Sequence, residues 1–340
     1  MGNLKGKVAV VAGATRGAGR GIARALGEAG AVVYCTGRSV EGRPSPYGRP
    51  ETIEETAAMV TAAGGVGIAA RVDHADEAQV RALFERVDAE RGRLDVLVNN
   101  VAGSDMRMAG WTSAWETDLK DGAAVFENAV LSHVSTAKHA APLMIRKKRG
   151  LIVEVTEFDL LLCGGNILAQ LVKFSLKGLA AMLAEELRPH RVAAVAITPG
   201  YLRSELMLEH FKVTEENWRD AAKKDKNFLE SESPLFVGRA VAALAADRKV
   251  LGRTGALLSS YGLAREYGFT DYDGRRPDFG RKFAEMGWMR GPLLRHVEWL
   301  EGLTRCAREY LGEEQATPAP AAGARPRGRR RANKTRAEES

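Results

Sequence analysis

The sequence predicts an α/β protein in which one sheet of seven parallel strands is doubly wound, with helices on both of its faces. Three observations predict it. Short apolar runs rich in β-branched residues alternate with alanine-rich amphipathic stretches, the pattern of right-handed strand–helix–strand units. A glycine-rich turn joins the first apolar run to the first amphipathic stretch. With 340 residues, of which 45% are hydrophobic, the chain can bury one large core and still carry an extension.

The expected strands are seven short apolar runs, at residues 7–12, 31–36, 67–72, 94–99, 150–156, 192–198 and 256–259. The expected helices are six longer amphipathic stretches, at residues 18–29, 51–63, 77–91, 122–146, 168–188 and 235–246. Pro50 marks the start of the second helix, while Gly30 and Gly64 mark the ends of the first and second. Irregular stretches interrupt this alternation at residues 38–49, 103–121 and 201–233.

These elements indicate a single domain over residues 1–260, in which residues 201–233 form a lid. Residues 261–312 are rich in aromatic residues and arginine, and we expect a C-terminal extension packed on this domain. Residues 313–340 are expected to form a disordered basic tail. Of the net charge of +7, residues 316–340 contribute +5. An arginine-rich tail can bind nucleic acid, but a solvated tail is the favoured interpretation, so no nucleic-acid partner is expected.

The composition argues against several kinds of site. Cys35, Cys163 and Cys306 are odd in number and widely spaced, which disfavours a disulfide framework or a metal cluster and fits a reducing cytoplasm. No run approaches the roughly 20 apolar residues of a membrane span. The chain enters its first strand at Lys7, which leaves no room for a signal peptide. We therefore expect a cytoplasmic protein with no metal and no membrane partner.

The glycine-rich turn predicts a dinucleotide site. A buried strand at residues 8–11 is followed by the turn and then by a helical run. Glycine is needed there because the chain turns sharply and its backbone must approach a pyrophosphate, which the helix N-terminus attracts through its free N–H groups. The candidate cofactor-binding residues of this turn are Gly13, Thr15, Arg16, Gly17, Ala18 and Gly19.

The end of the second strand predicts which dinucleotide is bound. An NAD site usually places an acidic residue there to bind the ribose 2′-hydroxyl. Gly37 holds that position, Arg38 follows it, and Arg16 lies in the glycine turn. Two guanidinium groups without a carboxylate suit a 2′-phosphate, which arginine binds through two charge-assisted hydrogen bonds. NADP(H) is therefore favoured over NAD.

Residues 5–260 resemble the short-chain dehydrogenase/reductase family, and the fold this implies is Rossmann-type. The family's TGxxxGxG motif corresponds to residues 12–19, with Ala12 in place of Thr, and its NNAG motif begins at Asn99-Asn100. The family's proline–glycine turn corresponds to Pro199-Gly200. The resemblance implies that Asp73 contacts the adenine. It also implies that the cofactor's nicotinamide and ribose are flanked by Asn100, Val101 and the turn at residues 199–202, with Pro199 and Gly200.

The same resemblance predicts an altered catalytic centre. The family transfers a proton with a Tyr four residues before a Lys, about thirteen residues after a hydroxyl-bearing residue. Counting from Thr156 gives residue 169, and Glu186-Leu187 downstream selects Lys173 as the Lys. Residue 169 is Ala. A rival alignment uses Lys173 and Lys177 as the Tyr and Lys positions, but it needs a deletion of one helical turn.

Two of the implied catalytic groups are present without the acid. Thr156 keeps a hydroxyl that could bind a carbonyl, and Lys173 keeps an ammonium for the nicotinamide ribose. Tyr201, which follows the proline–glycine turn, is the candidate for a relocated acid, although a wall residue is the simpler interpretation. Glu157, Asp159 and Lys173 itself are other substitutes. Loss of a positioned acid typically costs about 10²–10⁴-fold in rate, so weak hydride transfer could survive.

The remaining apolar residues leave the substrate open. Residues 160–168, with Met207, Leu208, Phe211 and Trp218, suggest a pocket for a hydrophobic small molecule, or else a core or a homo-oligomer interface. Three hypotheses follow. The first is a divergent NADP(H)-dependent oxidoreductase acting on a carbonyl or an alcohol. The second is a redox-silent NADP(H)-binding protein, and the third is non-redox chemistry such as dehydration or cyclisation in the same pocket.

Overall fold

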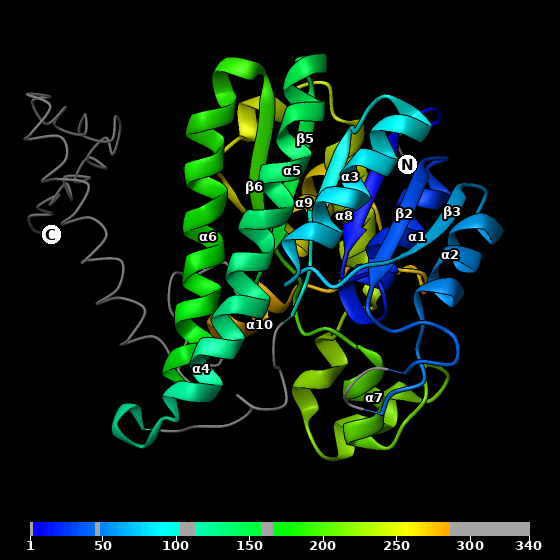
Figure 1. Ribbon diagram of the computed structural model, residues 1–340. Helices are drawn as coiled ribbons and strands as arrows, with labels where there is room; N and C mark the ends of the chain where they lie inside the picture. The colour runs from blue at the N-terminus through cyan, green and yellow to red at the C-terminus, as the bar shows by residue number, and fades with distance from the viewer. Residues whose placement is uncertain (1–2, 45–47, 103–112, 158–165, 286–340) are drawn as a thin grey trace, which may run out of the picture. The chain divides into compact units, whose positions relative to one another are not determined.

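The computed structural model in Figure 1 describes residues 3–44, 48–102, 113–157 and 166–285. The chain divides into one unit over Met1–Met289 and a second over Arg290–Ser340. The second unit lies outside the described residues, and with it most of the expected extension and all of the expected tail.

One parallel sheet contains all seven expected strands, in the order β3-β2-β1-β4-β5-β6-β7. The strands are β1 (Val8–Ala12), β2 (Val32–Gly37), β3 (Val66–Arg71), β4 (Val96–Asn99), β5 (Gly150–Val155), β6 (Val192–Thr198) and β7 (Leu257–Ser259). The order reverses between β1 and β4, so the carboxyl ends of these two strands meet at the switch point of a doubly wound sheet. The Rossmann-type fold expected from the sequence is confirmed.

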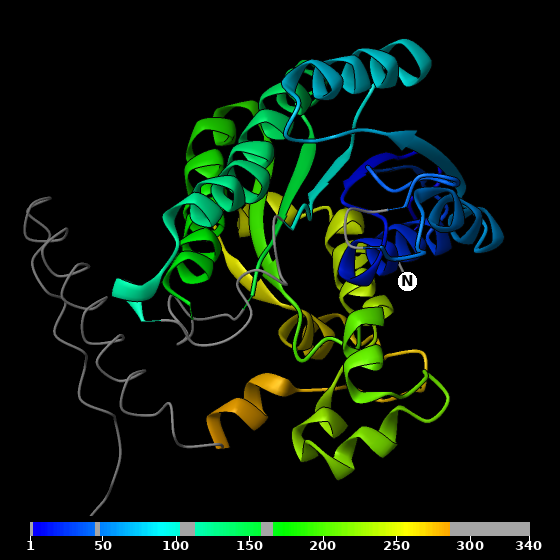
Figure 2. The same cartoon turned by 60° about the horizontal axis from the view of Figure 1, so that its bottom comes forward.

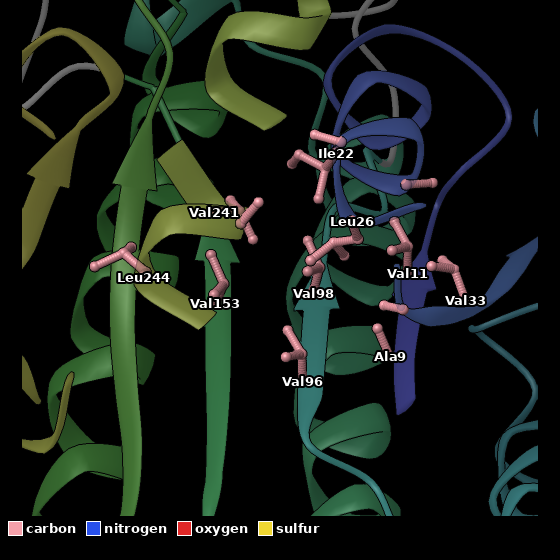
Figure 3. Close-up of a cluster of buried hydrophobic side chains, with 14 of the residues drawn as sticks. Ala9, Val11, Ile22, Leu26, Val33, Val96, Val98, Val153, Val241 and Leu244 are labelled. Atoms are coloured by element: carbon pink, nitrogen blue, oxygen red, sulfur yellow. The ribbon is translucent and has the colours of Figure 1, made fainter. Parts of the chain in front are cut away.

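Alternation along the strands builds two cores. Ala9 and Val11 of β1 point to one face of the sheet, whereas Val8 and Val10 point to the other, because successive side chains of a strand alternate. On the first face they meet α1 and α8, as the labelled side chains of Figure 3 show. The strands are apolar on both faces because helices cover both.

Helices α1 (Gly17–Glu28), α2 (Ile53–Ala62) and α8 (Pro234–Ala246) cover one face. Helices α3 (Glu77–Arg91), α5 (Ser132–Lys147) and α6 (Ile167–Leu187) cover the other. Helices α1 and α8 pack closely, since a Cβ added to Gly21 would lie 2.0 Å from the Pro234 carbonyl oxygen. α2 begins at Ile53 because Thr52 and Glu55 form a reciprocal capping box.

The helix expected at residues 122–146 has an interrupted backbone. It consists of α4 (Leu119–Phe126), a π-helical segment (Glu127–Leu131) and α5. Asn128 and Ser132 both direct side-chain hydrogen bonds to backbone carbonyls one turn earlier, which competes with regular α-helical pairing. The hydrophobic periodicity of the sequence gives no sign of this change of helix type.

The irregular stretch at residues 201–233 contains short helices of its own. They are α7 (Glu205–Phe211) and two 3₁₀ turns, Trp218–Lys223 and Lys226–Glu230. Beyond the sheet follow α9 (Ser260–Tyr267) and α10 (Phe279–Glu285). Figure 2 shows α10, in orange, beside the yellow-green lid segment, which it also contacts.

One helical segment among the described residues, Ile167–His190, is long and apolar enough to cross a membrane by length and composition. It comprises α6 and the turn after it. Ala184 and Leu187 are buried where this helix packs on the sheet.

Candidate cofactor and active site

The glycine turn at the end of β1 has the close backbone packing expected of a dinucleotide loop. Gly13 has a φ of +79°, and a Cβ there would lie 2.5 Å from the Asn100 carbonyl oxygen. A Cβ on Gly19 would lie 2.1 Å from the carbonyl oxygen of Gly13. The Asn100 side chain donates to that same carbonyl at 3.0 Å. The loop is therefore held against the end of β4, and only glycine fits these two positions.

The N-terminus of α1 already binds a carboxylate. The Gly17 N–H donates to Oε2 of Glu205, from α7, at 2.8 Å, while Oε1 of Glu205 lies 3.8 Å from the Arg20 guanidinium. The first N–H groups of a helix lack partners inside the helix and favour a negative charge. Glu205 therefore stands where a dinucleotide phosphate would be held, and the residues present fit such a group.

The two arginines at the predicted 2′-phosphate site have carboxylates nearby. Arg16 Nη1 lies 3.7 Å from Glu51, and Arg38 Nη1 lies 3.7 Å from Asp73. The expectation of a carboxylate-free site is wrong, because Glu51 is brought in from the loop before α2. Arg16 Nη1 is nevertheless buried without a hydrogen-bond partner among the described residues, so this guanidinium can still accept an anionic ligand.

Arg49 balances the charge of Glu51. It donates to both carboxylate oxygens, at 2.7 and 3.1 Å. Burial alone would raise the pKa of Glu51, but hydrogen bonds with Arg49 bring it below its usual range, so the group is ionised at neutral pH. A side chain at Gly37 would bring its Cβ within 2.7 Å of the Thr15 hydroxyl, which disfavours an acidic residue at that position.

Thr156 and Lys173 lie together at the end of β5. The Thr156 hydroxyl donates to the backbone carbonyl of Lys173 at 3.2 Å. The ammonium of Lys173 lies 3.1 Å from the carboxylate of Glu157, which is more than half exposed. The structure thus places Thr156 against the backbone of Lys173. Lys177 of the rival alignment is buried one turn further along α6.

Ala169 lies in the first turn of α6. Asn166 caps this helix, accepting hydrogen bonds from the backbone N–H groups of Leu168 and Ala169. The methyl side chain of Ala169 offers no proton at the position where the sequence analysis places the family's acid. The other proposed substitute, Asp159, lies outside the described residues, as do residues 160–165.

Tyr201 is anchored in the lid. Its hydroxyl donates to Asp225 at 3.1 Å, and its ring packs edge-on against Phe228 and Phe279. Burial, followed by the Asp225 charge, raises the pKa of this phenol above its usual value. This geometry favours a wall residue over a relocated acid.

A buried glutamate holds the proline–glycine turn after β6. Oε2 of Glu232 accepts hydrogen bonds from the Gly200 N–H at 2.8 Å and from the Ser260 hydroxyl at 2.6 Å. Its other oxygen is buried without a hydrogen-bond partner among the described residues. Burial raises the pKa of Glu232 to about 8, so the group is protonated at neutral pH.

The apolar residues proposed as a pocket wall divide into two groups. Phe211 and Trp218 are buried in the lid's own cluster with Phe228. The Trp218 ring has guanidinium groups over it, from Arg203 at 4.2 Å among others. These residues build the lid. Met207 and Leu208 are only partly buried against it, so they remain candidates for a pocket wall.

Sequence reasoning missed three acidic residues of the site: Glu51, Glu205 and Glu232. All three lie in loops or short helices where no apolar period fixes the direction of a side chain. For Glu205, the one signal in the sequence is that an acidic residue follows soon after the proline–glycine turn. Among the described residues, no group of three or more His, Cys, Asp or Glu side chains could hold a metal ion.

Comparisons with known proteins agree with this geometry. The short chain dehydrogenase family model matches residues 7–214. The chain is 36% identical over 312 residues to dehydrogenase/reductase SDR family member 1 of Mus musculus, covering 87% of this chain and 96% of that protein. It is 29% identical to a 7α-hydroxysteroid dehydrogenase of Clostridium sardiniense over 62% of this chain and 76% of the relative.

A solved structure supports the fold independently. The crystal structure of YwfH, an NADPH-dependent reductase involved in bacilysin biosynthesis, superposes with a TM-score of 0.59 at 21% identity, over 74% of this chain and 96% of that one. The glycine turn, the switch-point site and these comparisons lead to one conclusion: the chain belongs to the short-chain dehydrogenase/reductase family.

Proposed function

We propose that this protein is an NADP(H)-dependent oxidoreductase that reduces a carbonyl, or oxidises the alcohol, of a hydrophobic small molecule. The observation that carries the proposal is the anion site at Gly17, where the Glu205 carboxylate is bound in the manner of a phosphate. Arg16 and Arg38 would bind the 2′-phosphate. The guanidinium nitrogen Nη1 of Arg16, which has no hydrogen-bond partner among the described residues, supports NADP(H) over NAD.

The chain's own residues would then orient the two reactants. Bound nicotinamide supplies the hydride. Lys173 would hold the nicotinamide ribose, with Thr156 placed beside it to bind the substrate oxygen. Asp73 would face the adenine, and Asn100, Val101 and the turn at Pro199 and Gly200 would flank the nicotinamide ribose. Because Ala169 has no proton to give, the proton would come from water, and turnover would be slow.

The named relatives are consistent with this substrate class. One is called a hydroxysteroid dehydrogenase and another an NADPH-dependent reductase. Met207 and Leu208 give the lid apolar side chains that a hydrophobic substrate could contact. A cytoplasmic location remains a prediction from the cysteine content.

Redox-silent binding is the second candidate. Two observations favour it: the methyl group of Ala169, and the engagement of Tyr201 by Asp225. In that case the cofactor site would serve sensing or assembly. Non-redox chemistry in the same pocket remains a third possibility.

A homo-oligomer would use the outer face of α5 and α6, which lie side by side in Figure 1. Large apolar side chains are exposed along this face and the π segment before it, namely Leu131, Val134, Leu171, Phe174 and Met182. Exposed apolar side chains of this size are typical of a protein contact.

The test is a titration of the protein with NADPH, followed by absorbance at the nicotinamide band with a panel of alicyclic and aromatic ketones. We expect binding, with slow consumption of NADPH that depends on the ketone. Lys173→Ala should weaken binding. Absence of NADPH binding would overturn the proposal, whereas binding without consumption across the panel would support the redox-silent candidate.

A further inference from the structure

A histidine–glutamate pair is fully buried beneath the catalytic end of β5. Nδ1 of His133, in the first turn of α5, lies 2.6 Å from Oε2 of Glu154, on β5. Oε1 of Glu154 accepts a hydrogen bond from the Asn99 side chain at 2.8 Å. These residues come from α5, β5 and β4, so three elements meet at one ionisable pair that has no role in the chemistry described above.

The pair lies between the two halves of the candidate site. Glu154 and Thr156 are two residues apart in one extended segment, so their side chains point to the same face of the sheet. On its other side, Nε2 of His133 lies 3.1 Å from the carbonyl oxygen of Val101. Val101 follows Asn100, whose side chain binds the glycine turn. The contact between His133 and the Val101 carbonyl therefore holds the start of the loop after β4 against the buried pair.

The hydrogen bonds determine how many protons the pair must hold. The Val101 carbonyl can only accept, so Nε2 must carry a proton. The contact between Nδ1 and Glu154 needs a second proton, located on either partner. The hydrogen bonds to Val101 and to Glu154 exist together only when the pair holds these two protons and is neutral overall.

We propose that His133 and Glu154 are positioning residues for the nicotinamide side of the cofactor site: Glu154 shares a proton with Nδ1 of His133, and the proton on Nε2 holds the Val101 carbonyl. This inference rests on the proposed cofactor site. Loss of the hydrogen bond to Val101 would weaken cofactor binding, since Asn100 and Val101 would then lose their fixed position.

The pair's other polar neighbours carry no charge at neutral pH. Asn99 has no ionisable group. His74, after β3, contacts the hydroxyl of Thr136 at 3.2 Å. Thr136 lies on α5, three residues after His133. Burial lowers the pKa of His74 to about 3, with a smaller contribution from the charge of His133, so it remains neutral at neutral and alkaline pH.

Glu154→Gln and His133→Leu form a matched pair of variants. A glutamine can accept from Asn99 and donate to Nδ1, which leaves the proton on Nε2 at every pH. We expect Glu154→Gln to bind NADPH as tightly as the wild type at pH 7. His133→Leu should bind NADPH about tenfold more weakly, the loss of about one buried hydrogen bond.

A second readout needs no cofactor. In ¹⁵N-labelled free protein, the Nε2 proton of His133 should be present at pH 7 in both the wild type and Glu154→Gln. Absence of that proton in the wild type would overturn the inference, as would an NADPH affinity that His133→Leu leaves unchanged. If the wild type binds no NADPH at all, the cofactor proposal fails, and the imidazole signals still decide the proton arrangement.

Discussion

The cofactor half of the site is built mainly from backbone groups, whereas the catalytic half is built from side chains. At the end of β1 the site consists of backbone: the turn at Gly13, the N–H of Gly17 and the carbonyls around them. At the end of β5 it consists of side chains from separate segments, Thr156 and Lys173 among them. Both halves lie at the carboxyl edge of the same parallel sheet.

This difference explains how the chain can keep one half and lose part of the other. A backbone site depends on turn geometry, so it persists as long as a few glycines remain. A side-chain site can lose its function through one substitution, as we propose for Ala169, while the helix around it stays intact. The fold therefore does not determine the reaction.

The backbone half should be the most sensitive to added atoms. Gly13→Ala places a Cβ 2.5 Å from a backbone oxygen in a residue with positive φ, whereas Gly42 has a similar φ of +72° and open space. We expect Gly13→Ala to reduce the free energy of unfolding by about 2–5 kcal/mol, and Gly42→Ala by about 1 kcal/mol. Equal losses in urea denaturation would show that crowding at the turn is unimportant.

The turn after β6 should instead make the free energy of unfolding depend on pH. Because the pKa of Glu232 is about 8 in the folded protein and 4.5 in the unfolded chain, the unfolded state releases its proton first. Stability should therefore fall as the pH rises from 4.5 to 8. Glu232→Gln keeps an acceptor for the Gly200 N–H and should remove this fall, which amounts to about 4 kcal/mol between pH 4 and pH 8. A constant difference between variant and wild type across this range would contradict the protonated carboxyl.

Cofactor choice should depend on side chains even within the backbone half. Arg38→Ala should weaken NADPH binding at least about tenfold, or 1.4 kcal/mol, because one guanidinium is lost from the 2′-phosphate. NADH binding measured by calorimetry on the same samples is the control and should be unchanged. An equal loss for both nucleotides would place Arg38 elsewhere.

We expect the smallest effect at Glu205, the lid residue that contacts the cofactor half. Glu205 occupies the anion site of α1 in the free protein, so a dinucleotide must displace it. Glu205→Ala should raise NADPH affinity about two- to fivefold, within the range for a charge at a helix N-terminus. Glu205→Gln, which keeps an oxygen without the charge, should show a smaller rise. Weaker binding by both variants would mean that Glu205 helps to hold the cofactor.

The strands, the sheet and the glycine turn were predictable because each depends on a short-range pattern. Alternation places Ala9 and Val11 on one face of β1, and the turn at Gly13 follows directly in the chain. The position of Glu51 beside Arg16 was not predictable, since it depends on how a loop of irregular sequence folds back. The same is true of His133 and Glu154, whose contact joins a helix to a strand about twenty residues later.

The central claim is that the cofactor half is intact while the catalytic half lacks only its acid. Ala169→Tyr tests it most directly, with NADPH affinity and ketone-dependent NADPH oxidation measured on the same preparations. The account predicts unchanged affinity and a rate increase within the ~10²–10⁴-fold range for a positioned acid. A flat rate with NADPH binding intact, across a broad panel of ketones and aldehydes, would contradict it and indicate a pocket rebuilt for binding or for other chemistry.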